Sequence, residues 1–286
     1  MRRSWWLILP IVLMTIYLGI NLYAKRRVQK EVDAAIAEMA SFADVRYEDV
    51  DFNLFTHKTS VKGVVISPVG EERKLFIDEI VVFKAEEGRK IFTRLHMAFK
   101  GIRVEGQEGR VTELLEELGY EPEETRADVE LDYKFDPEGK DFYLRTLSYR
   151  VRGMGEMSLS LHLSNVDLES GALSLLLSFP QILIHEARLS YRDDSLVPRL
   201  LKVTAEKRGI SVEGLIEEIT AEIEREVSRT EDRITSEALT AFKEFLEDPK
   251  EISVIISPRR PVPLGKLKRA KDPAQLMKTL NLRVKS

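Results

Sequence analysis

The four histidines are the first residues to consider for chemistry, because imidazole can act as a general base or a metal ligand near neutral pH. The chain of 286 residues has no cysteine, which excludes disulfides, thiolate catalysis and cysteine-bound zinc. His162 falls on the serine-rich side of a predicted strand, so we expect it to be solvated. His185 falls among apolar residues of the next predicted strand and is expected to be a core histidine, while His57 and His96 have no second ligand at a familiar spacing. We therefore expect no metal site.

The familiar catalytic motifs are also missing from the sequence. His185-Glu186 begins like the helical zinc-protease motif, but position 189 is Leu and the segment has the pattern of a strand. There is no Gly-x-Ser-x-Gly elbow, Walker loop or Rossmann fingerprint. Asp193-Asp194 directly precedes a predicted helix, where acidic residues and Ser195 are suited to capping. The sequence therefore predicts a protein that is not an enzyme and that needs no cofactor.

Charge is distributed very unevenly along the chain, although the net charge is only −4. Residues 1–30 carry +6, residues 252–286 carry +8, and the middle of the chain carries −18. So acidic a body would repel nucleic acid, and we expect no nucleic-acid partner. The basic tail is our candidate contact for anionic lipid or a protein partner, through Arg259, Arg260, Lys266, Lys268, Arg269 and Lys271. The alternative is a solvated tail or one that docks on the acidic body.

An uncharged apolar segment of 19 residues runs from Trp5 to Tyr23. As a helix it would span about 28 Å, close to the roughly 30 Å hydrocarbon core of a membrane. A cleaved signal peptide would have a shorter apolar region, so we expect an uncleaved anchor in a single pass. The predicted anchor residues are Trp5, Trp6, Pro10, Tyr23, Lys25, Arg26 and Arg27. The charges on either side of this segment favour a body in the cytoplasm. Long domains, however, cross the membrane largely regardless of charge, so both sides of the membrane stay open as the location of the body.

Period-two alternation predicts that strands dominate the chain after this segment. The clearest example is Ala127–Asp136, where apolar and charged residues alternate without interruption. Short turns between successive strands predict an antiparallel meander. The other predicted strands are Val61–Ile66, Leu75–Phe83, Leu95–Val104, Phe142–Val151, Met157–Leu163, Leu173–Phe179, Ile182–Arg192 and Ile252–Ile256.

Helical patterns occur mainly after the predicted meander. Short helices are predicted at Val111–Leu118 and Leu196–Lys207, and an amphipathic one from Ser211 to about Glu247. Its apolar stripe is interrupted at Thr230–Asp232, which leaves a kink or a second helix open. This long helix could form a coiled coil, but we expect it to cover the apolar face of the sheet instead.

Together these patterns predict an α+β fold. It comprises an N-terminal transmembrane helix, then a mainly antiparallel curved β-sheet covered by a long C-terminal amphipathic helix. We expect a signal anchor with basic flanks in residues 1–30 and a strand-rich region in 31–120. Residues 121–286 would hold the meander, the long helix and the basic tail.

Several stretches resemble the AsmA-like family of bacterial proteins anchored in the inner membrane. They are Val45-Arg46-Tyr47, Leu54-Phe55, Val61-Lys62-Gly63-Val64-Val65-Ile66 and Ile77-Asp78-Glu79-Ile80-Val81-Val82. Leu118-Gly119-Tyr120 and Pro261-Val262-Pro263-Leu264 look similar to smaller periplasmic relatives. The resemblance implies a body on the periplasmic side and a role in envelope maintenance or lipid handling, and it carries over no functional residue. The long helix at Ser211–Glu247 departs from the family's repetitive β-groove.

Two functional hypotheses follow from these observations. The first is a membrane-tethered, extracytoplasmic protein for cell-envelope maintenance that handles lipid or another apolar ligand on a one-sided β-sheet. The alternative is a non-catalytic structural or interaction module of a membrane-associated assembly. In both, the lipid membrane is the expected partner through the N-terminal segment, with envelope proteins as further candidates. The position of the long helix should separate them.

Overall fold

The computed structural model describes residues 26–34, 36–37, 40–53, 55–70, 73–105, 110–269 and 272–286. In these ranges the chain forms twelve strands, paired antiparallel wherever the register is defined, together with several helices. It divides into two compact units. The first holds the described residues up to Lys84 and those from Met97 to residue 105, and the second holds Ala85–His96 and the chain from residue 110.

The first unit is built from the early strands, except for residues 85–87 of β4 and 92–96 of β5, which belong to the second unit. Strands β1 and β2 both pair with β3, which is followed in the sheet by β4 and then β5. The predicted strands at Val61–Ile66, Leu75–Phe83 and Leu95–Val104 are therefore confirmed, each as part of a longer strand. The bounds are β1 Ala43–Arg46, β2 Asp49–Asn53, β3 Lys58–Pro68, β4 Lys74–Glu87 and β5 Phe92–Glu105.

Two Lys-Gly pairs within these strands adopt the same unusual backbone. Gly63 in β3 has φ 61° and Gly101 in β5 has φ 65°, the left-handed region that strongly favours glycine. At Gly63 a Cβ atom would collide with the side chain of Glu48, and at Gly101 with that of Asp78. Glycine is thus required at both positions, by the backbone and by the neighbouring carboxylate.

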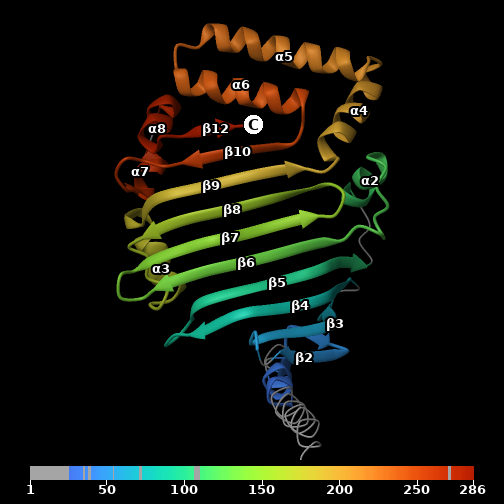
Figure 1. Cartoon of the computed structure of the whole chain (residues 1–286), viewed down its shortest axis with the longest axis vertical. Helices are drawn as coiled ribbons and strands as arrows, with labels where there is room; N and C mark the ends of the chain where they lie inside the picture. Colours follow the sequence, from blue (N-terminus) through green and yellow to red (C-terminus); the bar gives the residue numbers. More distant parts are fainter. Residues whose placement is uncertain are drawn as a thin grey trace, which may run out of the picture. The chain divides into compact units, whose positions relative to one another are not determined.

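The second unit is centred on an antiparallel meander. Strands β6, β7, β8 and β9 lie in sequence order, β10 follows β9, and β12 follows β10 at the edge (Figure 1). The two-residue strand β11 pairs with the other end of β9. The bounds are β6 Ala127–Asp136, β7 Asp141–Val151, β8 Gly155–Ser164, β9 Leu183–Asp193, β10 Glu251–Ile256, β11 Val262–Pro263 and β12 Arg283–Lys285.

Helices and one 3₁₀ turn join these strands. Gly209 ends α4 in the left-handed conformation (φ 67°), and the Ser211 side chain accepts a hydrogen bond from the Gly214 backbone to cap α5. The bounds are α2 Arg110–Glu117, α3 Ala172–Ser178, η1 Phe179–Gln181, α4 Leu196–Arg208, α5 Val212–Arg229, α6 Arg233–Glu247, α7 Leu264–Arg269 and α8 Pro273–Leu280.

The predicted α+β fold, with one long C-terminal helix over the sheet, is wrong. The segment Ser211–Glu247 forms two helices, because Asp232 caps a new helix by accepting hydrogen bonds from the backbone and hydroxyl of Thr235. Helices α5 and α6 lie beyond β10 and β12, at the edge of the sheet, and not across β6 to β9 (Figure 1). The long amphipathic stripe therefore closes an edge of the sheet and leaves its face open.

The predicted N-terminal anchor falls in a part of the chain that the structure does not describe. Trp5, Trp6, Pro10, Tyr23 and Lys25 lie outside the described residues. Over the ranges that are described, none of the helices is both long enough and apolar enough to cross a membrane. Residues 26–34 are helical, and Arg27 pairs with Glu31 one turn later at 3.4 Å.

The predicted strand at Leu173–Phe179 is wrong as well. Its alternating leucines and serines form α3 and then η1, which begins where Pro180 can occupy an early helical position. Leu175 packs on the core around Phe135, whereas Leu176 and Leu177 point outward and are 71% and 73% exposed. The pattern of a leucine-rich run of seven residues is compatible with both a strand and a helix.

Candidate functional site

Apolar side chains of β6 to β9 form rows that cross four neighbouring strands. In one row Leu131 lies opposite Leu147, which lies opposite Leu159, which lies opposite Leu189. The next row is Val129, Tyr149, Met157 and Tyr191. Paired residues share a face of an antiparallel sheet, so both rows lie on one side of it. We call these eight residues the apolar face.

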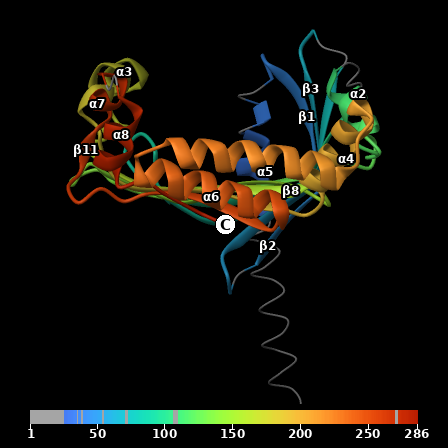
Figure 2. The ribbon, with the colours of Figure 1, turned by 90° about the horizontal axis from the view of Figure 1, so that it is seen from above.

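Helices cover the ends of this side of the sheet. At one end Phe135, Phe142 and Leu163 pack with Leu175 of α3 and Leu264 of α7 in a buried core. At the other end Phe245 of α6 meets the Tyr191 ring edge-on, with centroids 6.1 Å apart. Figure 2 shows α3 and α7 at one end of the strands and α2 and α4 at the other.

The middle of the apolar face is left uncovered. The exposed fractions are 40% for Leu147, 51% for Tyr149, 50% for Met157 and 43% for Leu189. Single exposed apolar residues are common, but a contiguous group usually marks a binding surface. The long-helix prediction had assigned these side chains to the core, so the exposed group is a finding of the structure.

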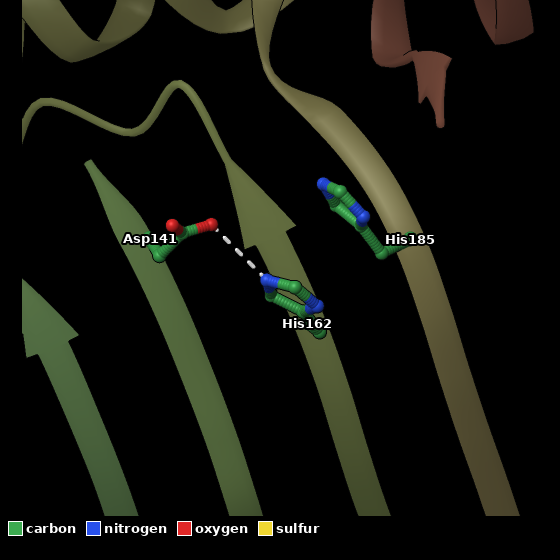
Figure 3. Close-up of side chains that lie close together, drawn as sticks. All are labelled: Asp141, His162 and His185. Atoms are coloured by element: carbon green, nitrogen blue, oxygen red, sulfur yellow. Dashed lines mark hydrogen bonds and ion pairs between the residues drawn. The ribbon is translucent and has the colours of Figure 1, made fainter. Parts of the chain in front are cut away.

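The opposite, polar side of the same strands carries a cluster of ionisable residues. Asp141 begins β7, His162 lies near the end of β8, and His185 lies near the start of β9. Nε2 of His162 donates to Oδ1 of Asp141 at 3.1 Å, and the His162 and His185 rings stack with centroids 4.2 Å apart (Figure 3). One ligand atom from each of the three residues lies within 4.8 Å of the other two. We call these residues the Asp-His-His cluster.

A β-bulge brings His185 to this side of the sheet. Glu186 is the partner of His162, whereas Ile184 is the partner of Leu163, so His185 is an extra residue in β9. An extra residue redirects the side chains that follow it. Strict alternation had placed His185 with the apolar residues and His162 with the serines, so the sequence prediction that separated them is wrong.

The residues around the cluster fix the two rings. Tyr143 stacks on the other side of His162, with centroids 4.1 Å apart, so His162 lies between two rings. Oγ of Ser164 lies 2.7 Å from Nε2 of His185. Burial, helped by the adjacent His162, lowers the pKa of His185 below its usual value. His185 therefore favours the neutral form, which has a free nitrogen lone pair.

His57 and His96 lie away from this cluster, and the sequence had not linked them to it. His96 has Nε2 2.8 Å from Oε1 of Glu130, farther along the second unit's strands. His57 meets the Phe52 ring edge-on in the first unit. The capping prediction holds for Asp193 alone, which accepts a hydrogen bond from the Val197 backbone at the start of α4. Asp194 instead pairs with Arg150 at 3.4 Å, and the Ser195 side chain makes no capping hydrogen bond.

The basic tail folds back onto the second unit. Arg259 and Arg260 are exposed between β10 and β11, and Lys266 is exposed on α7. Lys268 and Arg269 belong to α7, and Lys271 lies outside the described residues. The tail is thus built into β11, α7, α8 and β12, and its role in binding lipid or a partner stays a prediction.

Comparison with known proteins gives matches whose descriptions state no function. Residues 148–286 match a family described as "Uncharacterized protein". The chain is also 28% identical over 297 residues to an "Uncharacterized protein" of Aquifex aeolicus (strain VF5), and the match covers 96% of each chain. The family region begins within β7 and includes His162 and His185 but not Asp141. Neither description mentions AsmA, so that resemblance stays a prediction.

Proposed function

We propose that the protein is a membrane-tethered, extracytoplasmic protein of the bacterial cell envelope that binds lipid acyl chains on its apolar face. The observation that carries the proposal is the contiguous exposure of Leu147, Tyr149, Met157 and Leu189 on three neighbouring strands, β7, β8 and β9. The inner membrane is the proposed location, with the body on the periplasmic side.

The chemistry of this surface suits an acyl chain. Both rows of the apolar face are aliphatic or aromatic, with no charged member. Each methylene group that leaves water contributes about 0.8 kcal/mol to binding. The apolar segment at residues 5–23 supports a membrane as the source of such a ligand, because it would hold the body close to one.

The test is mass spectrometry of lipids that co-purify with a chain starting at residue 31. We expect the wild-type body to retain lipid and a Tyr149→Ser, Met157→Ser double variant to lose most of it. Both positions are about half exposed, so the variant should still fold. The matched control is Leu200→Ser, which changes a side chain of similar exposure (39%) on α4 and should retain lipid.

The outcomes separate the two functional hypotheses. A wild-type body that carries no lipid, or a double variant that retains as much lipid as the Leu200→Ser control, contradicts lipid binding. Protein captured by the apolar face in place of lipid would favour the interaction module.

A further inference from the structure

We propose that Asp141, His162 and His185 form a binding site for a divalent transition-metal ion, of which zinc is the best match. Two imidazoles and one carboxylate are a donor set that zinc commonly binds. The site lies on the polar side of the sheet, so it is independent of the apolar face and of the proposed lipid ligand.

The separations between ligand atoms are close to what zinc requires. Two donors about 2.1 Å from a tetrahedral ion are about 3.4 Å apart. Nε2 of His162 and Oδ1 of Asp141 are 3.1 Å apart, so a metal ion could replace the proton they now share. The three ligand atoms span up to 4.8 Å, so closing the site takes a shift of at most about 1.4 Å.

The cluster is rigidly supported by the sheet. Its members come from β7, β8 and β9, whose pairing continues to Ser164 and Leu183 beyond the cluster (Figure 3). Oγ of Ser164 at 2.7 Å fixes the orientation of the His185 ring, and Tyr143 supports His162 from the other side. Metal-binding histidines usually need such a partner, because it sets the tautomer and the direction of the ring.

The charges around the cluster favour a cation. Glu186 is opposite His162 and Asp136 is opposite Asp141 in the strand pairing. Lys134 is opposite Tyr143, and its side chain is exposed. Two further cations near the cluster are paired with other carboxylates, since Lys140 lies 3.6 Å from Asp167 and Arg188 lies 3.4 Å from Glu251.

The site remains open to solvent on one side. The side chains of His162 and Asp141 are 19% and 29% exposed, so a hydrated ion can reach them. Three protein ligands leave a fourth tetrahedral position for water or for a small ligand.

The experiment is a zinc titration of the full-length chain without a polyhistidine tag, after treatment with a chelator. Affinity is measured by competition with a coloured zinc chelator. We expect about one zinc ion per chain, and an affinity that falls at least about tenfold in His162→Ala and in His185→Ala. Ser164→Ala should weaken binding less, because it removes only the support of His185. His96→Ala is the matched control, since it removes a histidine paired with a carboxylate elsewhere, and it should bind like wild type.

A second readout guards against variants that misfold. Cobalt(II) in a tetrahedral site absorbs visible light strongly, so the wild-type chain should gain colour with cobalt while His185→Ala should not. Circular dichroism of each variant reports whether the fold is kept. The proposal is overturned if the wild-type chain binds no zinc, or if folded His162→Ala and His185→Ala variants bind it as tightly as His96→Ala.

Discussion

The carboxylate of Glu79 is stabilised by two donors within the first unit. Lys100 donates to Oε2 at 2.9 Å, and the hydroxyl of Ser60 donates to Oε1. The hydrogen bond from Lys100, followed by that from Ser60, holds the pKa of Glu79 below its usual value of 4.5. When the pH is lowered, Glu79 therefore takes up a proton in the unfolded chain at a higher pH than in the folded chain.

This carboxylate predicts a loss of stability in acid. The contribution of Glu79 should be fully present above pH 4.5 and should fall as the pH drops through its lowered folded pKa. Urea unfolding at about pH 7 and about pH 3.5 measures the loss, and Glu79→Gln should show a smaller one. An equal loss in wild type and in Glu79→Gln would show that other carboxylates carry the acid sensitivity.

Gly101 allows a second prediction at the scale of single residues. Gly101→Ala should lower the free energy of unfolding by more than about 1–2 kcal/mol, since a left-handed backbone costs that much and the Cβ also meets Asp78. Gly70→Ala is the control, because its φ is 83° and nothing lies within 4 Å of the added Cβ. The midpoints of urea unfolding of the two variants show which one loses more stability. Equal destabilisation would mean that Asp78 moves aside freely.

Single residues also show where prediction from the sequence fails. The four histidines could be found by inspection, and the polar side of β8 was correctly inferred for His162. The neighbourhood of His162 and His185 could not be inferred, because one extra residue in β9 reverses the side on which His185 lies. Alternation assumes perfect pairing, and a bulge leaves no clear mark in one sequence.

At the scale of elements, the start of α5 depends on one hydroxyl. Oγ of Ser211 accepts a hydrogen bond from the Gly214 backbone at 3.0 Å. Ser211→Ala should lower the free energy of unfolding by about 1 kcal/mol, because the backbone donor loses its partner. Thermal unfolding measures this loss of stability, and Ser228→Ala in the same helix is the control. The Ser228 hydroxyl only returns to the Glu224 carbonyl, so its loss should be nearly neutral. If the Ser211 cap did not stabilise the protein, Ser211→Ala and Ser228→Ala would have the same midpoint of thermal unfolding.

Elements were predicted well where a pattern was long and had clear ends. The bounds of β6 agree with the ten alternating residues. The prediction of the fold was wrong where the packing between elements decides the structure. The apolar stripe is interrupted at Thr230–Asp232, and there the cap at Asp232 starts a second helix and lets the chain reverse. A stripe shows that a helix has a partner but not which partner.

For the whole molecule, the absence of cysteine makes the proposed topology easy to test. A single cysteine in Glu138→Cys, at the exposed β6–β7 turn, should react with a membrane-impermeant maleimide in intact cells if the body is periplasmic. Ser4→Cys, before the apolar segment, should react only after the membrane is permeabilised. Labelling is read as a shift in mass. The reverse pattern would place the body in the cytoplasm and contradict the proposed location.

The edge of the second unit has a consequence for the order of events during synthesis. Strand β10 pairs with β9 only after residues 194–250 have been made, and β12 then pairs with β10 through Arg283, Val284 and Lys285. Oγ of Ser286 donates to Oε2 of Glu244 on α6 at 2.6 Å. Because a ribosome encloses the newest residues, this edge can be completed only once residues 283–286 have left the ribosome. A chain truncated before Arg283 would leave β10 with unpaired backbone groups, the kind of strand edge that promotes aggregation.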